Sequence, residues 1–416
     1  MTKKSDAPAI RFKGFSDAWE QRKFDEVFDC TVPNNTLSRA ELSYDEGTVL
    51  NVHYGDVLIK YGSVLDVQKD DIPRIPHRCR EDFNGALLQD GDVIIADTAE
   101  DETTGKACEI GNLQGSAIVS GLHTMVCRPR NRMALGYLGY YLNSNAYHHQ
   151  LLPLMQGIKV LSLSRSNIQK TSVSYPIAVK EQQLIAYYFS QLDNLITLHQ
   201  RKFEKLTNVK KSMLEKMFPQ NGSSYPEIRF KGFTDPWEQR KLGELALFNP
   251  KDELPQTFEY VDLESVVGTE MLSHRTEVKS SAPSRAQRLA HTGDLFYQTV
   301  RPYQKNNYLF EKPDNNYVFS TGYAQMRPYV DGYFLLSLLQ SERFVKVVLD
   351  NCTGTSYPAI NANDLAEIEV AAPSDESEAQ RIGTIFRSID NLITLHQREL
   401  EKLQNIKKSM LEKMFV

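Results

Sequence analysis

Apolar residues recur alternately every fourth and every third position along two long segments of the chain. In the first segment these positions hold Ile185, Phe189, Leu192, Ile196, His199, Phe203, Leu206 and Met213, and in the second Ile382, Phe386, Ile389, Ile393, His396, Leu400, Leu403 and Met410. This spacing predicts the a/d seam of a coiled coil. A helix over 181–217 spans roughly 55 Å, too long to be stable in water without a partner. We therefore expect the two helices to pair with each other.

Polar residues interrupt this seam at matching places in the two helices. They are His199 and Lys210 in the first helix, and His396 and Lys407 in the second. A polar residue at a seam position lowers stability but excludes wrong registers. The alternative interpretation places these side chains at the edge of the seam with their polar ends in water. The sequence leaves both interpretations open, and neither makes the histidines catalytic.

The helices belong to a larger internal repeat. Residues 192–218 and 389–415 are identical at 22 of 27 positions, and residues 10–23 and 228–241 at 12 of 14. Between these repeated ends the two halves share little beyond a Gly-Asp that precedes an apolar run, at Gly91-Asp92 and at Gly293-Asp294. We expect a variable domain over 1–180, a helix over 181–218, a linker over 219–227, a second variable domain over 228–375 and a second helix over 376–416.

Each variable segment mixes short β-type runs with one amphipathic helical run. The β-type runs are 93–95, 172–179, 295–297 and 368–371, and the helical runs are 134–155 and 333–349. The pattern predicts the α+β class, with two α/β domains and two long helices in a pseudo-twofold internal repeat.

The composition is that of a folded chain: 416 residues, of which 41% are hydrophobic and 24% charged. No apolar stretch is long enough for a signal peptide or a bilayer span, so we expect a cytoplasmic protein with no membrane partner. The five cysteines show no CxxC spacing, which argues against a disulfide framework and a zinc site. The net charge of −5 weighs against a simple nucleic-acid binder, although charges can be segregated by surface.

No motif for catalysis stands out. Gly105-Lys106-Ala107 lacks the earlier glycine and the hydroxyl residue of a phosphate-binding loop. Asn249-Pro-Lys-Asp252 lacks the second proline and the aromatic residue of an amino-methyltransferase motif, and Pro373-Ser-Asp-Glu376 suits a helix start. His148-His149 has no further ligand at metal spacing. We expect no catalytic residue, metal site or cofactor in this chain.

The layout resembles the DNA-specificity subunit of type I restriction-modification systems, over the whole chain. The resemblance rests on two divergent domains in tandem with two near-identical helices. It also rests on three repeated sequence features: Phe12-Lys-Gly-Phe15 and Phe230-Lys-Gly-Phe233, the Trp19 and Trp237 that follow them, and Leu198-His-Gln-Arg201 and Leu395-His-Gln-Arg398.

This resemblance implies two target-recognition domains that each read one part of a split DNA sequence, and helices that pair antiparallel and set the gap. It implies a non-catalytic subunit whose partners are double-stranded DNA, methylation subunits and restriction subunits. Two methylation subunits would match the pseudo-twofold repeat. S-adenosylmethionine, ATP and magnesium are then the cofactors of those partner subunits.

Candidate DNA-contacting residues are of the types that read base edges or hold phosphates, and several follow a loop glycine, Gly157 or Gly354. In the first domain they are Thr104, Lys106, Lys159, Ser162, Ser164 and Arg165, and in the second Arg301, Tyr303, Gln304, Lys305, Ser356, Tyr357 and Asn361. A competing hypothesis is a two-armed protein scaffold that never touches DNA. The acidic net charge favours that alternative.

Overall fold

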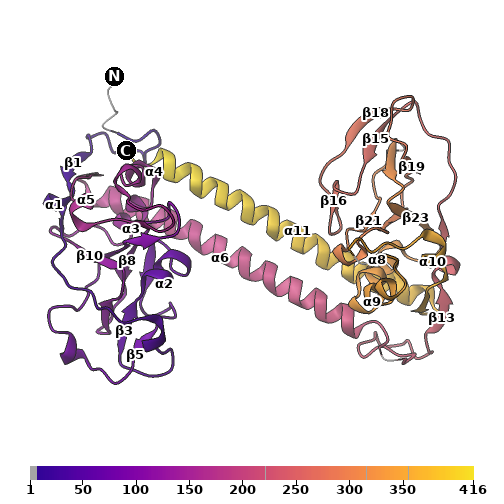
Figure 1. Cartoon of the computed structure of the whole chain (residues 1–416), viewed down its shortest axis with the longest axis horizontal. Helices are drawn as coiled ribbons and strands as arrows, with labels where there is room; N and C mark the ends of the chain where they lie inside the picture. The colour runs from indigo at the N-terminus through magenta and orange to yellow at the C-terminus, as the bar shows by residue number, and fades with distance from the viewer. Residues whose placement is uncertain (1–6, 221, 315, 355) are drawn as a thin grey trace. The chain divides into compact units, whose positions relative to one another are not determined.

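The chain forms two compact units that exchange helix ends. The structure, a computed structural model, describes residues 7–220, 222–314, 316–354 and 356–416. Unit 1 comprises Met1–His199 with Glu399–Val416, and unit 2 comprises Gln200–Arg398 (Figure 1). Each unit therefore combines one variable segment with the first part of one long helix and the last part of the other.

Unit 1 is built around a five-stranded sheet. Its strand order is β2 (Phe28–Asp29), β10 (Thr124–Pro129), β6 (Val93–Ala96), β8 (Ala107–Gly111) and β4 (Val64–Asp66). A three-stranded sheet has the order β5 (Arg74–Ile75), β3 (Val49–Val52) and β9 (Ala117–Ser120), and two ribbons pair β1 (Glu20–Lys23) with β12 (Ser172–Tyr175) and β7 (Thr98–Ala99) with β11 (Leu161–Ser162). All four residues of β6 are buried, which explains its unbroken apolar sequence.

The helices of the variable segment in unit 1 are short. They are α1 (Phe24–Val27), α2 (Tyr54–Ile59), α3 (Tyr137–Leu142), α4 (Asn145–His148) and α5 (Arg165–Ile168), with 3₁₀ turns at Arg39–Glu41, Arg80–Phe83 and Leu152–Leu154. The single helical run expected over 134–155 is wrong, because the chain breaks between α3 and α4. There Asn143 Nδ2 donates to the Gly139 carbonyl (2.8 Å) and Ser144 Oγ to the Tyr141 carbonyl (2.6 Å), in competition with helix hydrogen bonds.

Unit 2 carries two four-stranded sheets. One has the order β14 (Ala246–Phe248), β23 (Tyr323–Pro328), β20 (Leu295–Gln298) and β21 (Tyr308–Leu309), and the other β18 (Arg275–Val278), β15 (Thr257–Val261), β22 (Tyr317–Ser320) and β19 (Ala286–Leu289). Ribbons pair β13 (Glu238–Lys241) with β24 (Glu369–Ala372) and β16 (Val266–Val267) with β17 (Glu270–Met271).

The helices of the variable segment in unit 2 are α7 (Leu242–Leu245), α8 (Gly332–Gln340), α9 (Glu342–Asp350) and α10 (Ala362–Glu367), with a 3₁₀ turn at Pro302–Gln304. The run expected over 333–349 is split here too, because Ser341 caps α9.

The Gly-Asp shared by the two halves fixes the same strand pair in both units. Asp92 and Asp294 are almost fully buried just before β6 and β20. Arg128 on β10 donates to Asp92 at 2.7 and 2.8 Å, and Arg327 on β23 donates to Asp294 at 2.8 and 3.1 Å. A buried carboxylate requires such a partner, since an unpaired one would be strongly destabilising.

The repeated segments 10–23 and 228–241 tie each variable segment to the start of its own long helix. Arg11 donates two hydrogen bonds to the buried carboxylate of Glu181, at 2.7 and 2.8 Å, and the Trp19 indole lies 3.4 Å from the same carboxylate. Arg229, Glu378 and Trp237 repeat this arrangement in unit 2. The near-identity of these segments thus has a structural explanation in a buried ion pair.

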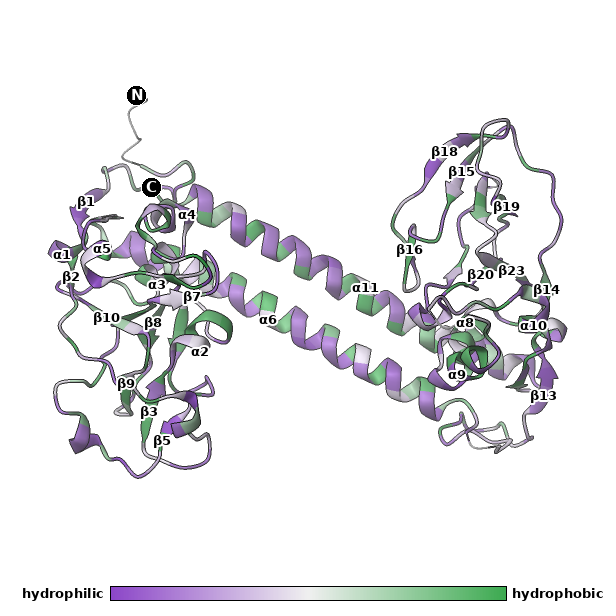
Figure 2. Cartoon of the chain, in the orientation of Figure 1, coloured by the Kyte–Doolittle hydropathy of each residue, from purple (hydrophilic) through white to green (hydrophobic). Residues whose placement is uncertain are grey.

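The long helices are α6 (Val179–Lys216) and α11 (Glu376–Lys413), each of 38 residues (Figure 1). Apolar positions alternate with polar ones along both (Figure 2). In unit 1, Phe189 stacks on Phe415, and Asp193 binds Lys407 at 2.5 Å. A later residue of α6 thus contacts an earlier residue of the second segment, so the two helices run in opposite directions. Phe386 with Phe218, and Asp390 with Lys210 at 2.6 Å, repeat this in unit 2. The predicted antiparallel pairing is confirmed.

Every residue expected in the seam is buried or half-buried, including the two histidines. Lys210 and Lys407 each bind an aspartate of the opposite helix, and both lysine side chains are at most 25% exposed. These contacts favour the register-fixing interpretation of the two lysines over the edge interpretation. Among the described residues, every helix is too short or too polar to cross a bilayer.

The residues that directly follow each long helix complete an aromatic core. Phe415 lies in the core of unit 1, with ring centroids 5.7–6.3 Å from those of Trp19, Tyr137, Tyr141 and Phe189. Phe218 occupies the matching place in unit 2, against Trp237, Phe334 and Phe386. The core of each unit therefore requires the helix that comes from the other half of the sequence.

A buried carboxylate stabilises the start of α3. Glu109 on β8 is 1% exposed, and its Oε2 accepts the Gly139 amide at 2.9 Å. The residue before α3, Gly136, has no side chain to cap the helix, whereas Asp331 caps α8 in unit 2. Glu109, which lies on the neighbouring strand β8, thus takes the place of a local helix cap. Burial raises its pKa to about 7.

We predict that Phe415→Ala destabilises the full chain by about 3–5 kcal/mol, because it leaves a cavity among four aromatic rings. Denaturant unfolding measures the loss. Val416→Ala, a half-buried position at the end of the chain, is the control and should have a small effect. A loss below about 1 kcal/mol for Phe415→Ala would contradict the assigned core.

We also predict a pH-dependent difference between the wild type and Glu109→Gln. The folded pKa of Glu109 lies above its ordinary value of 4.5, so its contribution to stability is greatest below pH 4.5 and is lost as pH rises through about 7. Relative to the Gln variant, the wild type should lose up to about 3 kcal/mol across this window. Urea unfolding at several pH values tests this, with Glu26→Gln, an exposed position, as control. A flat difference would show that the carboxylate is not buried in solution.

Candidate nucleic-acid interface

A β-hairpin lies beside a loop in each unit. In unit 1 a bridge between Gln156 and Ser162 closes the hairpin, whose second arm, β11, pairs with β7. In unit 2 a bridge between Thr353 and Ala359 closes the corresponding hairpin, and Ala359 also bridges Val300. Sequence segments that are more than 50 residues apart are therefore brought together in the same way in both units.

The two loop glycines make these hairpins possible. Gly157 has φ 126°, and a Cβ there would lie 1.9 Å from the Val160 carbonyl oxygen. Gly354 has φ 86°, and its Cβ would lie 3.0 Å from the Tyr357 carbonyl oxygen. Glycine adopts this left-handed conformation without a steric penalty. The hairpin tips are therefore tight turns, which leave the neighbouring side chains exposed.

Four of the six candidate residues in unit 1 are exposed on or just after the hairpin: Lys159, Ser162, Ser164 and Arg165. Ser162 Oγ donates to the Gln156 carbonyl at 3.3 Å, and Ser164 caps α5 by accepting the Asn167 amide at 3.2 Å. Both serines thus have structural contacts. Lys159 and Arg165 present cations to solvent at the hairpin.

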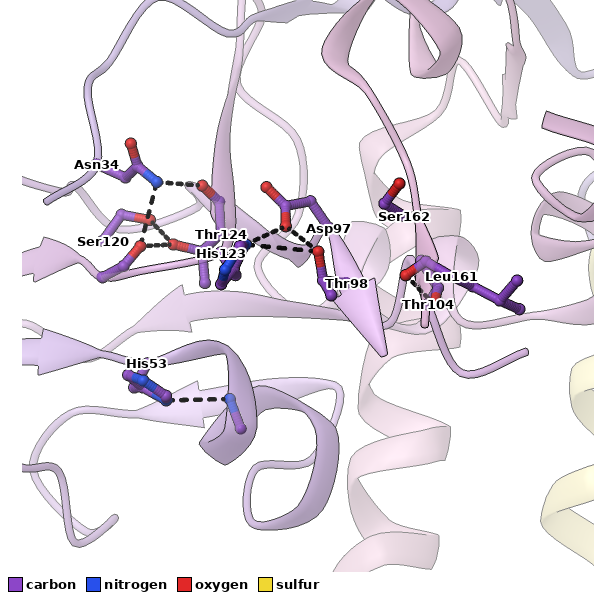
Figure 3. Close-up of polar contacts among 12 residues, drawn as sticks. Asn34, His53, Asp97, Thr98, Thr104, Ser120, His123, Thr124, Leu161 and Ser162 are labelled. Atoms are coloured by element: carbon purple, nitrogen blue, oxygen red, sulfur yellow. Dashed lines mark hydrogen bonds and ion pairs between the residues drawn. The ribbon is translucent and has the colours of Figure 1, made fainter. Parts of the chain in front are cut away.

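The other two candidates of unit 1 point into the protein. Thr104 is fully buried, and its hydroxyl donates to the Asp101 carbonyl at 3.0 Å. Lys106 Nζ donates to the Leu58 carbonyl at 2.8 Å, and burial lowers the pKa of its ammonium group. Figure 3 shows Thr104 next to Leu161 of β11, whose carbonyl lies 3.4 Å from the Thr104 hydroxyl. Thr104 therefore supports the hairpin from inside, whereas Lys106 contacts α2.

Arg301 and Tyr357 meet across the two loops of unit 2. The Arg301 guanidinium lies 4.4 Å from the centroid of the Tyr357 ring, which is 63% exposed. Arg301 and Lys305 both have positive φ, 54° and 56°, a strained conformation for residues with side chains. A planar cation stacked on an exposed aromatic ring is a pair that can pack against a base or sugar.

The remaining candidates of unit 2 differ in their contacts. Gln304 accepts a hydrogen bond from Gln298 at 2.9 Å, Lys305 pairs with Glu342 at 2.8 Å, and Asn361 caps α10 by accepting the Asp364 amide at 2.9 Å. Tyr303 and Ser356 are exposed. The half-buried Arg301 and the exposed Tyr303, Ser356 and Tyr357 are thus the residues of this set whose side chains make no hydrogen bond or ion pair with the described residues.

A polar cluster beside the hairpin of unit 1 was missed by sequence reasoning. Asp97 Oδ1 accepts the Thr98 hydroxyl at 2.8 Å and lies 3.3 Å from His123 Nδ1 (Figure 3). The Tyr54 ring packs between His53 and His123, with centroid distances of 4.7 and 5.3 Å. The only sequence signal was the short Gly121-Leu122-His123 turn between two β-type runs, which is not specific.

The charge around the hairpin of unit 1 is mixed. Residues 156–170 contain three basic and no acidic residues, while the neighbouring segment 97–102 contains four acidic ones. Phosphate attraction is therefore weaker than on a uniformly basic surface. Among the described residues, no group of three or more His, Cys, Asp or Glu side chains is placed to hold a metal ion.

Known proteins resemble this chain in sequence. The family model described as the type I restriction modification DNA specificity domain matches residues 16–208 and 234–405. A putative type I restriction enzyme MjaX specificity subunit of Methanocaldococcus jannaschii is 22% identical over 414 residues, covering 94% of this chain and 92% of that protein. The MjaVIII specificity subunit of the same organism is 25% identical over 252 residues, 56% of this chain and 59% of that protein.

A solved structure agrees in fold. The type I restriction-modification system S subunit from M. genitalium has a TM-score of 0.64 at 14% identity, with 99% of each chain covered. At that identity the likeness concerns the fold alone. The family model, in contrast, matches both halves of the sequence and most of its length. This chain therefore belongs to the family of type I restriction-modification DNA-specificity subunits.

Proposed function

We propose that each unit reads one half of a bipartite, asymmetric DNA sequence through its hairpin and the adjoining loop. The observation that carries this proposal is that the same hairpin and loop occur in both units with different side chains. The hairpin and loop of unit 1 carry Lys159 and Arg165, and those of unit 2 carry Arg301, Tyr303 and Tyr357. A common backbone that carries different side chains is what two unlike half-sites require, with some side chains holding phosphates and others contacting bases.

The long helices are proposed to set the spacing between the half-sites. Each has 38 residues and is roughly 57 Å long at 1.5 Å per residue. This length corresponds to between one and two DNA turns of about 34 Å. The paired Asp–Lys contacts in both units support a fixed register, since sliding one helix along the other would break them.

The helices are also proposed to dock the methylation subunits. Leu195 and Leu198 are 44% and 45% exposed, and Leu392 and Leu395, their copies in the second helix, are 43% and 50% exposed. Exposed leucines one helical turn apart form an apolar strip that a partner can cover. One strip in each unit supports two methylation subunits bound in the same way. This chain is then a non-catalytic subunit, and S-adenosylmethionine, ATP and magnesium are used by the methylation and restriction subunits.

The direct test is to map methylated adenines across the genome of a host that carries the partner subunits, with and without this chain. The proposal expects a bipartite motif that depends on the chain. A two-armed protein scaffold is the alternative, and it predicts no chain-dependent motif and no DNA affinity that falls with salt.

Removing one heptad from each helix should shorten the unread gap without changing either half-site. Deleting residues 199–205 and 396–402 preserves the seam, the four charged residues that pair across it and the four exposed leucines of the proposed docking strips. Seven residues correspond to about 10 Å, or about three base pairs. Methylation sequencing reads out the motif. Deletion in one helix only is the control and should abolish methylation, whereas an unchanged gap after the double deletion would refute the spacing role.

Lys159 and Arg165 are expected to contact phosphates of the first half-site. Replacing both with Ala should weaken DNA binding by the assembled complex and reduce the slope of log affinity against log salt by about two. The sequence preference should remain. Lys69→Ala is the matched control, because this exposed lysine lies next to β4 at the edge of the five-stranded sheet. An unaltered salt slope in the double variant would exclude the hairpin from the phosphate contacts.

A further inference from the structure

His123 adopts a left-handed backbone conformation, which residues with side chains take less readily than glycine does. It ends the turn between β9 and β10 with φ 53°. The matching turn between β22 and β23 ends at Gly322, and the backbone contacts agree: Asp97 N donates to the His123 carbonyl at 3.1 Å, and Thr299 N to the Gly322 carbonyl at 3.0 Å. Gly322 does not share the positive φ, so the left-handed conformation is particular to the turn of unit 1. A glycine at position 123 would adopt it with less strain than histidine does.

The turn that carries His123 is held by three neighbouring segments. Tyr54 N donates to the Leu122 carbonyl at 3.4 Å, and Asn34 Nδ2 donates to the Gly121 and Thr124 carbonyls at 3.3 and 3.0 Å. Asp97 contributes the third contact from the end of β6. The position of the His123 ring is therefore set by the fold before any ligand arrives.

One of the two ring nitrogens of His123 already has a partner within the protein. Nδ1 lies 3.3 Å from Asp97 Oδ1, while the same oxygen accepts the Thr98 hydroxyl at 2.8 Å (Figure 3). A carboxylate only accepts hydrogen bonds, so it holds the proton of a neutral imidazole on Nδ1. Nε2 is then left with its lone pair. Nε2 has no hydrogen-bond partner in the part of the chain that the structure describes, and the His123 side chain is 47% exposed.

This ring lies next to the hairpin. Thr98, whose hydroxyl contacts Asp97, is the register partner of Ser162 on β11. Leu163 N also donates to the Asp97 carbonyl at 2.8 Å. DNA bound at the hairpin, as proposed above, would therefore pass near the His123 side chain.

We propose that His123 determines specificity at one base pair of the first half-site, by accepting a hydrogen bond at Nε2 from the exocyclic amino group of an adenine or a cytosine in the major groove. This rests on the proposed function of the hairpin. The major groove presents adenine N6 and cytosine N4 as donors, whereas guanine O6 and thymine O4 are acceptors that a lone pair repels. Asp97 is a positioning residue, since it acts by fixing the tautomer of His123.

The test uses the assembled complex with its methylation partner and a library randomised over the half-site that the wild type defines. His123→Gly removes the ring and suits the backbone, so the thermal midpoint should not fall. We expect preference at one base pair to drop about tenfold, the size of one lost hydrogen bond, with every other position and the second half-site unchanged. Asp97→Asn, which lets the proton move to Nε2, should weaken preference at that same base pair. His149→Ala, an exposed histidine whose ring contacts the Asn145 carbonyl, is the matched control.

Base analogues test the contact itself. A duplex in which that adenine is replaced by purine, or that cytosine by 2-pyrimidinone, lacks the amino group and should bind the wild type about tenfold more weakly. His123→Gly should be indifferent to the replacement. An unchanged motif in His123→Gly, or equal losses at all positions, would overturn the inference. Absence of any bipartite motif in the wild type would instead refute the proposed function.

Discussion

The structure depends on the burial of the residues just after each long helix in the core built by the other half of the sequence. Phe415 completes the aromatic core of unit 1, and Phe218 completes that of unit 2. An amphipathic helix of this length is not stable alone, and neither core is full without the helix that ends in it. The two halves therefore fold as one exchanged pair, even though each carries its own sheets.

Charged contacts give this apolar pairing its register. Asp193 with Lys407 and Asp390 with Lys210 join the two helices in symmetric places, and Tyr140 donates its hydroxyl to Asp193 at 2.8 Å. Apolar packing tolerates sliding by a heptad, whereas these partly buried ion pairs do not. A chain whose proposed task is to set a distance benefits from such a constraint.

The variable segments separate support from recognition. Buried pairs such as Asp92 with Arg128 and Asp294 with Arg327 hold the same strands in both units. The hairpins and the adjoining loops carry exposed side chains that make few contacts within the protein, among them Lys159 and Tyr303. The proposed recognition residues can therefore differ between the units at little cost in stability.

The sequence by itself determined the repeat, the two helices and their seam, because these follow from local periodicity and from near-identity between the copies. It also pointed to Gly157 and Gly354, since only glycine tolerates those turns. Tertiary structure alone decided which polar residues face outward. Thr104 and Lys106 have the right chemistry for DNA but bind internal carbonyls, whereas His123 and Asp97, 26 residues apart, meet beside the hairpin. Side-chain direction depends on long-range strand pairing, and no local pattern in a single chain records it.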